Sequence, residues 1–473
     1  MKKLTFIMAI ATMALSACSP KEAPTTLLID NNLTAEEVAE GRLTPSVMWK
    51  MGRLGSATLS PDGTTALYTI TRYNMAENRG LTQIYVRDIA SGEEKELTDN
   101  TSNNIDPKWS ADGSKIYFMS NRSGSMQLWE MNAAGGAVKQ LTDVADGIEA
   151  YGVTAADDKL FYVKTVHIAD IKSSDRHKDM DKSKARIYDD LMARHWDYWD
   201  EGDYSHIFIA PLGEGVVKGG KDIMEGEPWD APLAPYFDSE EIAWNNAGTA
   251  LAYTCKHLTG AAYAVSTDSD IFIYDVVTAT TRNICKEWGE MPGYDKYPVW
   301  SPDDKMIAFR SMRRAGNESD KERLFVWNSE DGSMKDQTAS FDYNATNVVW
   351  EGNDTLYFIA PITATHQVCR VALNSNNVEV LTSGDHDINS FSKVGEKFLV
   401  HMNTIMKAPE LYLVGEDWSL RQTTFINQQI YDNIPMGECT KRWVRTTDGK
   451  QMLHLPVPMT LKEDMTIPFP SAL

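Results

Sequence analysis

A short pattern of apolar and polar positions recurs along most of the chain. In each copy a Trp or another apolar residue precedes a polar turn, often Asp-Gly, and an alternating apolar strand follows. Asp-Gly reverses the backbone at low steric cost, and alternation places one face of a strand in a core. The copies read LSPDGTTALY from 59, WSADGSKIYF from 109, VTAADDKLFY from 153, WNNAGTALAY from 244, WSPDDKMIAF from 300, WEGNDTLYFI from 350 and FSKVGEKFLV from 391.

A second strand follows most of these turns, and several copies then close on a Leu-Thr step. These strands read QIYVRD from 83, QLWEMN from 127, DIFIYD from 270, LFVWN from 324 and ELYLV from 410, and the Leu-Thr steps lie at 97–98, 141–142 and 381–382. Each unit is therefore expected to be an antiparallel sheet of about four short strands, with the period of a β-propeller blade. The sequence predicts an all-β, seven-bladed β-propeller, and an eighth, degenerate blade is also compatible with it.

One interval between copies is much longer than the others. Successive copies begin 41 to 56 residues apart, except for the 91 residues between the copies at 153 and 244. The extra chain, from about 170 to 203, begins with charged, unbranched residues, and Ile187, Leu191 and Arg194 share a helical face. We predict a helix over 182–196 that projects from the third blade. Insertions in repeat folds often form the binding face.

The N-terminus has the pattern of a secretory signal peptide. Lys2 and Lys3 precede an apolar run at 4–15, which is shorter than the roughly 20 residues that cross a bilayer. The following Leu-Ser-Ala-Cys resembles a bacterial lipobox and implies lipid attachment to Cys18; an ordinary signal peptide that contains a Cys is the alternative. The expected organisation is a signal peptide at 1–17, a lipidated tether at 18–42, the propeller at 43–440 and a hairpin with an off-pattern tail at 441–473.

Charge and cysteine content exclude some classes of function. The formal net charge of −21 becomes −23 without Lys2 and Lys3, which argues against nucleic acid as a partner. Four further cysteines are too sparse for a disulfide scaffold and lack the spacing of a metal site, although one or two disulfides are compatible with an oxidising compartment. We expect no cofactor and no metal. These cysteines are Cys255, Cys285, Cys369 and Cys439.

Three features together carry a family resemblance. The SPDG turns, the segment YDDLMARHWDYWDEGDYSHIFI and the closing WVRTTDGKQM resemble the N-terminal propeller of the prolyl oligopeptidase family of serine peptidases, over about 43–452. The dipeptidyl-peptidase and acylaminoacyl-peptidase branch is the most similar. In that family such a hairpin leads into an α/β-hydrolase domain with a G-x-S-x-G nucleophile elbow.

That elbow has no counterpart in this sequence. No Ser has Gly at both −2 and +2, and residues 453–473 contain four Pro and no alternating strand. The chain therefore looks truncated just past the domain boundary. Whether it belongs to an enzyme that acts in this form is uncertain; we expect the chain alone to hydrolyse neither dipeptidyl nor acyl-aminoacyl substrates.

The resemblance also implies a substrate-binding role for acidic residues of the insertion. Acidic residues on a propeller helix of dipeptidyl peptidases capture the free amine of a peptide, and Asp189 and Asp190 are the nearest candidates, although they do not match the family's Glu pair residue for residue. A solvated helix face is the alternative. His195 is expected to be a packing or interdomain residue and not a metal ligand, because no second His lies three or four positions away.

A polar loop in the last copy contains residue types of a catalytic triad. Asp385, His386 and Asp387 lie close in sequence to Ser383 and Ser390. Neighbouring residues of one loop rarely reach the geometry of a triad, and a polar turn explains them equally well. We therefore assign no catalytic residue.

Two functional classes follow. In the first, the chain is the non-catalytic propeller of a lipid-anchored serine peptidase of the bacterial cell envelope, either periplasmic or at the cell surface, and would admit only short peptides to the active site. In the second, it is a self-standing periplasmic propeller lipoprotein that binds a protein or an envelope ligand. The membrane is reached through the lipid on Cys18 in both classes. An exposed interdomain surface also predicts self-association.

Overall fold

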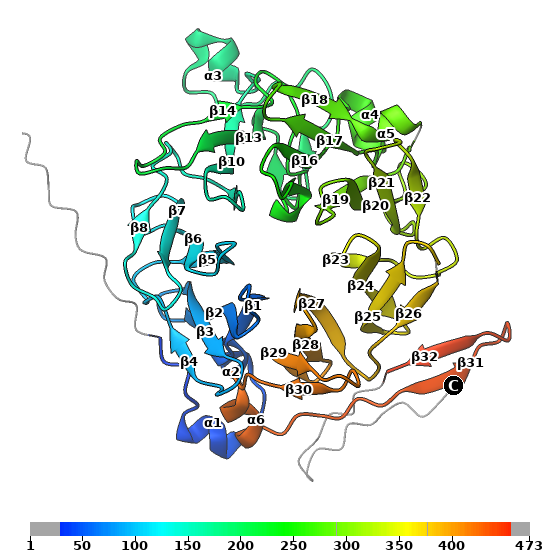
Figure 1. Ribbon diagram of the computed structural model, residues 1–473. Coiled ribbons are helices and arrows are strands. Elements are labelled where there is room, and N and C mark those ends of the chain that lie inside the picture. The colour runs from blue at the N-terminus through cyan, green and yellow to red at the C-terminus, as the bar shows by residue number, and fades with distance from the viewer. Residues whose placement is uncertain (1–28, 290, 376, 456–473) are drawn as a thin grey trace, which may run out of the picture.

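Most described residues belong to antiparallel sheets arranged around a central axis. The computed structural model describes residues 29–289, 291–375 and 377–455. These residues form five four-stranded sheets, one eight-stranded sheet and two two-stranded sheets. The larger sheets stand side by side in a ring (Figure 1). The prediction of an all-β propeller is confirmed.

The strands of each larger sheet follow one another along the chain, except in the third sheet, where the insertion separates the second strand from the third. The five four-stranded sheets contain β1 (Arg53–Leu59), β2 (Thr65–Asn74), β3 (Arg79–Asp88) and β4 (Glu94–Glu96); β5 (Asn104–Trp109), β6 (Lys115–Ser120), β7 (Gln127–Asn132) and β8 (Lys139–Gln140); β9 (Ala150–Val153), β10 (Lys159–His167), β13 (Asp203–Pro211) and β14 (Lys221–Asp222); β15 (Ile242–Trp244), β16 (Ala250–Cys255), β17 (Asp270–Asp275) and β18 (Thr280–Asn283); and β19 (Asp295–Trp300), β20 (Met306–Ser311), β21 (Arg323–Asn328) and β22 (Met334–Asp336).

The eight-stranded sheet consists of two four-stranded halves joined by a single parallel pair, His366 with Asp387. Counted as two, these halves bring the four-stranded units to seven, although the number of blades itself stays a prediction. The halves contain β23 (Thr346–Glu351), β24 (Thr355–Ile362), β25 (Thr365–Ala372) and β26 (Val378–Val380), then β27 (Asp387–Val394), β28 (Lys397–Thr404), β29 (Lys407–Val414) and β30 (Leu420–Gln422).

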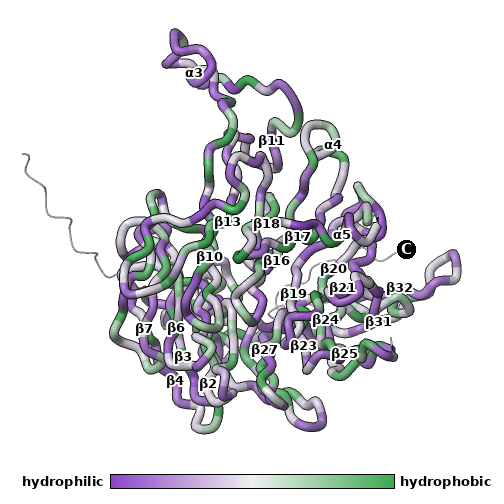
Figure 2. The backbone as a smooth tube through the Cα atoms, turned by 45° about the horizontal axis from the view of Figure 1, so that its top comes forward, coloured by the Kyte–Doolittle hydropathy of each residue, from purple (hydrophilic) through white to green (hydrophobic). Residues whose placement is uncertain are grey.

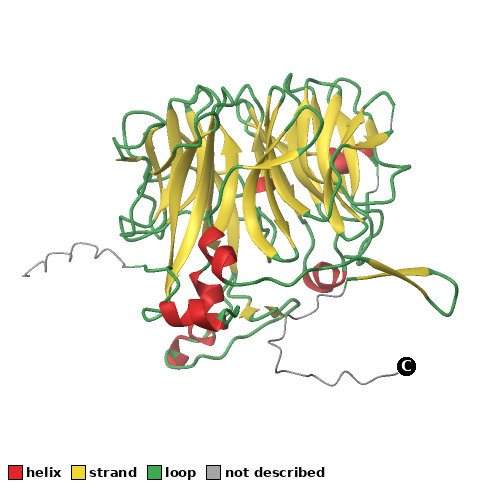
Figure 3. Cartoon of the chain, turned by 90° about the horizontal axis from the view of Figure 1, so that it is seen from below, coloured by secondary structure: helices red, strands yellow, loops and turns green. Residues whose placement is uncertain are grey.

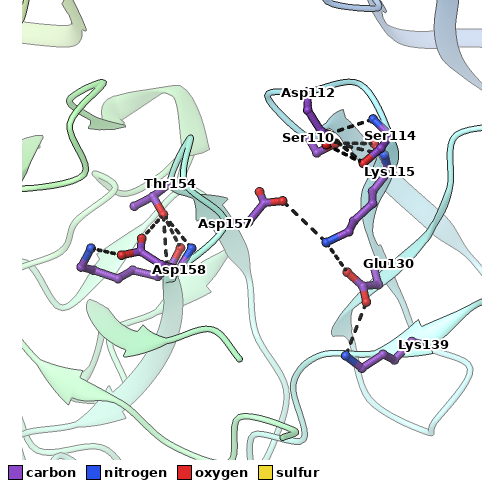
Figure 4. Close-up of polar contacts among 10 residues, drawn as sticks. Ser110, Asp112, Ser114, Lys115, Glu130, Lys139, Thr154, Asp157 and Asp158 are labelled. Atoms are coloured by element: carbon purple, nitrogen blue, oxygen red, sulfur yellow. Dashed lines mark hydrogen bonds and ion pairs between the residues drawn. The ribbon is translucent and has the colours of Figure 1, made fainter. Parts of the chain in front are cut away.

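The repeated turn is held by its own side chains. In the turn before β6, the Ser110 hydroxyl donates to Asp112 at 2.7 Å, and the Asp112 carboxylate accepts from the backbone N–H of Ser114 at 2.9 Å. These hydrogen bonds lower the pKa of Asp112 to about 2. Lys115 of this turn pairs with Asp157 of the next turn at 3.6 Å, so the polar tips of two sheets are joined (Figure 4).

The Trp that opens several copies joins each sheet to the previous one. The indole N–H groups of Trp244, Trp300 and Trp350 donate to backbone carbonyls of Gly152, Ala243 and Val299, at 3.0, 3.2 and 3.0 Å. Each acceptor lies on the first strand of the preceding sheet. The recurring Trp is thus explained by a contact between sheets, which a single repeat cannot make.

Apolar side chains fill the spaces between neighbouring sheets. Phe161 and Ile207 of one sheet pack with Leu251 and Tyr253 of the next, all buried. The same arrangement joins β20 and β21 to β24 and β25, where Phe358 is fully buried. Because each sheet buries its faces only against its neighbours, stability arises from the stacked ring.

Among the described residues, the first and last sheets exchange no strand where the ring closes. The side chain of Asn427 accepts from the backbone N–H of Gly52 at 2.8 Å and donates to its carbonyl at 3.0 Å. The backbone N–H of Leu59 in β1 donates to the Ser392 hydroxyl in β27 at 3.0 Å. The first and last sheets are therefore held by side-chain hydrogen bonds and by a shared apolar cluster.

Short helices lie outside the sheets. Val47 and Met51 pack with Ile430 and Ile434, so α2 and α6 brace the place where the ring closes, and Figure 3 shows helices below the strands. Residues 35–40, expected in the tether, form α1. The helices are α1 (Ala35–Glu40), α2 (Pro45–Lys50), α3 (Ser173–Arg176), α4 (Gly260–Val265), α5 (Ile284–Trp288) and α6 (Gln428–Asn433), with 3-10 turns η1 (Lys178–Met180) and η2 (Ser239–Glu241).

The predicted helix over 182–196 is wrong. The insertion between β10 and β13 contains α3, η1 and a two-residue hairpin of β11 (Arg194–His195) and β12 (Tyr198–Trp199). The backbone N–H of Ile187 donates to the carbonyl of Ile171 at 2.8 Å, and that of Ser173 to the carbonyl of Ala185 at 2.9 Å. These bonds between distant residues use backbone groups that a helix would need, so tertiary pairing overrides the local pattern.

The remaining sequence predictions concern the terminal hairpin, the cysteines and the two ends of the chain. The terminal hairpin is present, as β31 (Arg442–Arg445) paired with β32 (Gln451–His454). The four described cysteines, Cys255, Cys285, Cys369 and Cys439, are unpaired, so no disulfide forms among them. The signal peptide, Cys18 and the tail beyond 455 lie outside the described residues. Within the described ranges, no helix has the length and apolar character required to cross a membrane.

Candidate functional site

A pocket of about 600 Å³ lies between the insertion and the ring. One wall is the insertion, from Ile171 to Glu201, and the opposite wall combines the start of β13, the loop around Asp230 and the segment from Leu258 to Tyr263 that contains the start of α4. In Figure 2 the insertion rises from the ring beside α4. The pocket therefore draws on segments of two neighbouring sheets and on the insertion.

The base of the insertion is fixed by an ion pair. His167, the last residue of β10, contacts Asp203, the first residue of β13, with 2.7 Å between Nδ1 and Oδ1. Its other ring nitrogen lies 3.3 Å from Asp170. Asp203 and Asp170 raise the pKa of His167, since both stabilise the protonated ring. Both partners of the main contact are exposed, so this pair orients the insertion more than it stabilises the fold.

The lining is strongly acidic. Six carboxylates line the pocket with one guanidinium, that of Arg176, while cations outside the lining pair with Glu201 and Asp203. Such an excess of one sign in a concave site attracts cationic groups and repels anionic ones. The carboxylates belong to Asp189, Asp190, Asp200, Glu201, Asp203 and Asp230.

Asp189 and Asp190 both reach this pocket but have different surroundings. Asp189 is 76% exposed and pairs with Arg176 at 2.7 Å, so its charge is partly neutralised. Asp190 accepts a hydrogen bond from the backbone N–H of Leu191 at 2.8 Å and makes no ion pair with a described residue. Its carboxylate lies against Gly260, where a Cβ atom would come within 2.1 Å of Oδ2. Asp190 is therefore the more available anion.

Asp230 is the carboxylate most enclosed by protein. Its Oδ1 accepts a hydrogen bond from the backbone N–H of Ser205 at 2.8 Å. Burial raises its pKa to about 6, and the nearby Asp200 and Glu149 act in the same direction. Asp230 thus changes charge within the range of pH in which many enzymes work, unlike an ordinary Asp.

Aromatic rings form the apolar part of the site. Tyr188 and Trp199 stack with centroids 6.2 Å apart, and both line the pocket. Trp196 meets Tyr236 edge to face at 5.4 Å and stays 61% exposed. His195 packs against Trp196 at 5.6 Å and also lines the pocket. Rings beside carboxylates suit a ligand that has both a cationic and an apolar part.

The loop of Ser383 to Ser390 does not assemble a triad. His386 contacts Gln367 at 3.0 Å, Asp387 contacts His366 at 2.6 Å, and Asp385 pairs with Lys441. Each member therefore has a partner outside the loop, and desolvation lowers the pKa of His386. The polar turn explains these residues.

The pocket wall opposite the insertion was not predicted from the sequence. Asp230, Phe237 and Tyr263 line the pocket but come from loops of the two adjoining sheets, 40 or more residues from Asp190. The segment WDAPLAPYF from 229 to 237 carried a signal, because two Pro and no turn pattern interrupt the repeat there. Its place beside the insertion follows only from the stacking of the sheets.

Comparisons with known proteins agree with this architecture. A model of the TolB β-propeller domain matches residues 32–188. A dipeptidyl-peptidase 5 of Porphyromonas gingivalis is 36% identical over 413 residues, or 87% of this chain and 60% of the relative. A dipeptidyl-peptidase 5 of Porphyromonas endodontalis is 32% identical, over 90% of this chain and 61% of the relative. The chain carries a propeller of the prolyl oligopeptidase, or S9, family.

Solved structures support the fold of this S9-family propeller. An acylaminoacyl peptidase of Pyrococcus horikoshii superposes with a TM-score of 0.66 at 18% identity, over 88% of this chain and 59% of the other. The propeller domain of the Trilobed protease from Pyrococcus furiosus gives a TM-score of 0.54 at 15% identity, over 81% of this chain and 98% of the other. The chain spans about 60% of the length of the two Porphyromonas relatives.

Proposed function

We propose that this chain is the propeller of a lipid-anchored S9-type serine peptidase, and that its acidic pocket binds the amino terminus of short peptides. In this proposal a hydrolase domain on the same side as the insertion carries out the hydrolysis, and the propeller limits access to small substrates. The chain alone remains without an assigned catalytic residue. The observation that carries the proposal is a pocket of about 600 Å³ lined by six carboxylates, three of which make no ion pair with a described residue.

The position of the pocket supports this role. Figures 2 and 3 place the insertion and the terminal hairpin on the same side of the ring. In the S9 family the chain passes from such a hairpin into the hydrolase domain, so a domain attached there would face the pocket. A peptide held by its amino terminus would then extend from the propeller toward that domain.

The chemistry of the lining fits a protonated amine with an apolar neighbour. An ammonium group forms strong, charge-assisted hydrogen bonds with carboxylates. Asp190 is free of an ion pair with the described residues, whereas Asp189 is paired with Arg176, so Asp190 is the main candidate anion and Asp189 a secondary one. Tyr188 and Trp199 would contact the first side chain of the peptide.

Calorimetric titration with matched ligands tests this role. The purified chain should bind Gly-Phe amide, and N-acetyl-Gly-Phe amide should bind at least about ten times more weakly, since the acetyl group removes the charge. Asp190→Asn should weaken binding of the free amine and leave the acetylated ligand unaffected. Glu416→Gln, which changes an exposed acid in the turn between β29 and β30, is the matched control. Equal affinity for both ligands would contradict the proposal.

The lipid anchor and the envelope location are tested separately. Lipid on Cys18 would place the propeller at a membrane surface outside the cytoplasm, in the periplasm or at the cell surface. Cys18→Ala should move the chain from the membrane fraction to the soluble fraction of cells that process lipoproteins. Membrane association that survives this substitution would show that lipidation of Cys18 is not the anchor.

A further inference from the structure

A polar motif recurs at the edge where one sheet meets the next. In the sheet of β1–β4, Gln83 on the third strand accepts a hydrogen bond from the Thr98 hydroxyl at 2.6 Å. Thr98 in turn accepts from the backbone N–H of Ile84 at 3.0 Å. Asn104, the first residue of the next sheet, donates to Gln83 at 2.9 Å. Every buried donor and acceptor in this motif is neutral and paired.

The motif recurs elsewhere in the ring, with the Gln and the Thr 15 positions apart in two cases and Glu410 and Thr424 14 positions apart. Gln127 pairs with Thr142 at 2.7 Å, Gln367 with Thr382 at 2.8 Å, and Glu410 with Thr424 at 2.6 Å. In each case the Thr hydroxyl also accepts from the backbone N–H of the residue after the Gln or Glu, at 2.8, 2.9 and 2.8 Å. The motif is therefore a standard joint of this ring.

The sheet of β15–β18 has different chemistry at this joint. Asp270 takes the place of the Gln, and Cys285, 15 positions later, takes the place of the Thr. The correspondence is set by geometry, because the backbone N–H of Ile271 points at the Cys285 sulfur at 3.4 Å. Asp295, the first residue of β19, corresponds to Asn104. Two carboxyl groups and a thiol thus replace an amide, a hydroxyl and an amide.

This replacement leaves a buried carboxyl group without a well-placed hydrogen-bond donor. Asp295 is fully buried, and neither of its carboxylate oxygens makes a hydrogen bond of ordinary geometry with a described residue, although the Ser311 hydroxyl and the Cys285 thiol lie close to them. Asp270 is 7% exposed and accepts from the Asn283 side chain at 2.7 Å, with the Lys286 ammonium 3.8 Å away.

We propose that Asp270, Cys285 and Asp295 form a zinc site at this joint. One ligand atom from each residue lies within 4.8 Å of the other two. Tetrahedral zinc has bonds of about 2.0 Å to oxygen and about 2.3 Å to sulfur, so its ligand atoms lie roughly 3.3–3.5 Å apart and small side-chain shifts close the site. Mixed thiolate and carboxylate donors favour zinc over magnesium and calcium, which prefer oxygen alone.

The surroundings support the three proposed ligands. A divalent ion, together with Lys286, offsets the three negative charges of the ionised ligands. Asn283 orients the Asp270 carboxylate and also caps α5, the helix that carries Cys285. Because the three ligands are buried, zinc would enter during folding and would stabilise the joint between β17 and β19.

Metal analysis of the whole chain tests this site. Chain produced with zinc and then dialysed should retain one equivalent by mass spectrometry, and the cobalt form should show thiolate-to-metal charge-transfer absorption in the near ultraviolet. The triple variant Asp270→Gln, Cys285→Thr and Asp295→Asn copies the joint of the sheet of β1–β4, so it should fold and lose both signals. Cys369→Ser, a buried thiol outside the cluster, is the matched control and should keep them.

Thermal melting distinguishes the metal from shared protons. A chelator present during refolding should lower the melting midpoint of the natural sequence and of the Cys369 variant but leave that of the triple variant unchanged. If the natural sequence retains no zinc and is insensitive to the chelator, the carboxyl groups hold protons instead, and the site is refuted. Retention of zinc by the triple variant would equally refute this choice of ligands.

Discussion

The repeated sheets and the insertion between β10 and β13 differ in what holds their backbone in place. In the sheets, strands pair with neighbours a few residues away in sequence, and buried apolar side chains fill every space between them. In the insertion, most side chains are exposed, and its conformation depends on a few contacts such as Arg176 with Asp189 and Tyr188 with the carbonyl of Asp200. The sheets therefore supply stability, and the insertion supplies the pocket.

This difference separates fold from function within one domain. A propeller built from equivalent sheets offers the same surface many times, so a specific site must come from a departure from the repeat. Two segments of this chain depart from the repeat. The insertion creates an acidic pocket at the surface, and the exchanged side chains at the joint of β17 and β19 create a buried cluster of potential metal ligands.

The largest expected contrast is between a core residue and an exposed aromatic residue. Phe358→Ala should lower the free energy of unfolding by about 3–5 kcal/mol, because it opens a cavity in a fully buried cluster. Trp196→Ala, at a residue that is 61% exposed in the insertion, should change it by less than about 0.5 kcal/mol. Urea denaturation followed by circular dichroism measures both. Comparable losses for the two variants would show that the insertion is part of the stabilising core.

The same contrast decides how much of the fold could be predicted from sequence. The strands after LSPDG at 59 and WSADG at 109 were predictable, because each repeat carries its own turn and its own alternation. The indole contacts of Trp244 and Trp300 were not, because their acceptors belong to the neighbouring sheet. The helix predicted over 182–196 was wrong, since Ile187 and Ser173 form backbone hydrogen bonds across the insertion.

The candidate site was predictable only where one segment supplies it. Asp189 and Asp190 were found through the resemblance of their segment to an S9 propeller. Asp230 and Tyr263 were not, because the stacking of sheets brings them to the pocket from other parts of the chain. The cluster of Asp270, Cys285 and Asp295 was also missed, since its spacing matches no metal motif and its equivalence to the Gln and Thr pairs is a matter of backbone register.

A smaller effect is expected where the insertion meets α4. Gly260→Ala introduces a side chain at a φ of +58°, and its Cβ would lie 2.1 Å from the Asp190 carboxylate. The backbone conformation should cost about 1–2 kcal/mol of unfolding free energy, and the contact should displace Asp190 and weaken amine binding. Calorimetry and denaturation measure the two effects. Gly332→Ala is the control, because Gly332 lies at a turn with a φ of +69° and has open space around it. This variant measures the cost of the backbone conformation without a steric contact.

The pH dependence of stability provides a third test. Asp230 has a pKa of about 6 in the folded chain, above its ordinary value of 3.8. Between pH 3.8 and about 6, Asp230 is therefore protonated in the folded chain and ionised in the unfolded chain. The contribution of Asp230 to stability is therefore full below about pH 4 and is lost as the pH rises through about 6. Asp230→Asn should raise stability by about 1 kcal/mol at pH 8, after allowance for solvent screening, and leave it unchanged at pH 4. Thermal melts of Asp230→Asn and of the control Glu416→Gln at both pH values measure this difference. The same pH dependence of the melting midpoint in both variants would contradict this account.

The smallest effect on stability is expected at the ion pair of the pocket wall. Arg176→Gln removes the partner of the exposed Asp189 and should change the free energy of unfolding by less than about 0.5 kcal/mol, as for most surface ion pairs. It also leaves the pocket without its guanidinium, so amine binding should become tighter by about two- to five-fold and more sensitive to salt. Arg314→Gln breaks a comparable pair with Asp320 away from the pocket and should leave binding unchanged. If Arg176→Gln instead weakened binding or unfolded the insertion, Arg176 would be needed to hold the pocket wall in place. The proposed contrast between sheets that supply stability and an insertion that supplies the pocket would then be wrong for this residue.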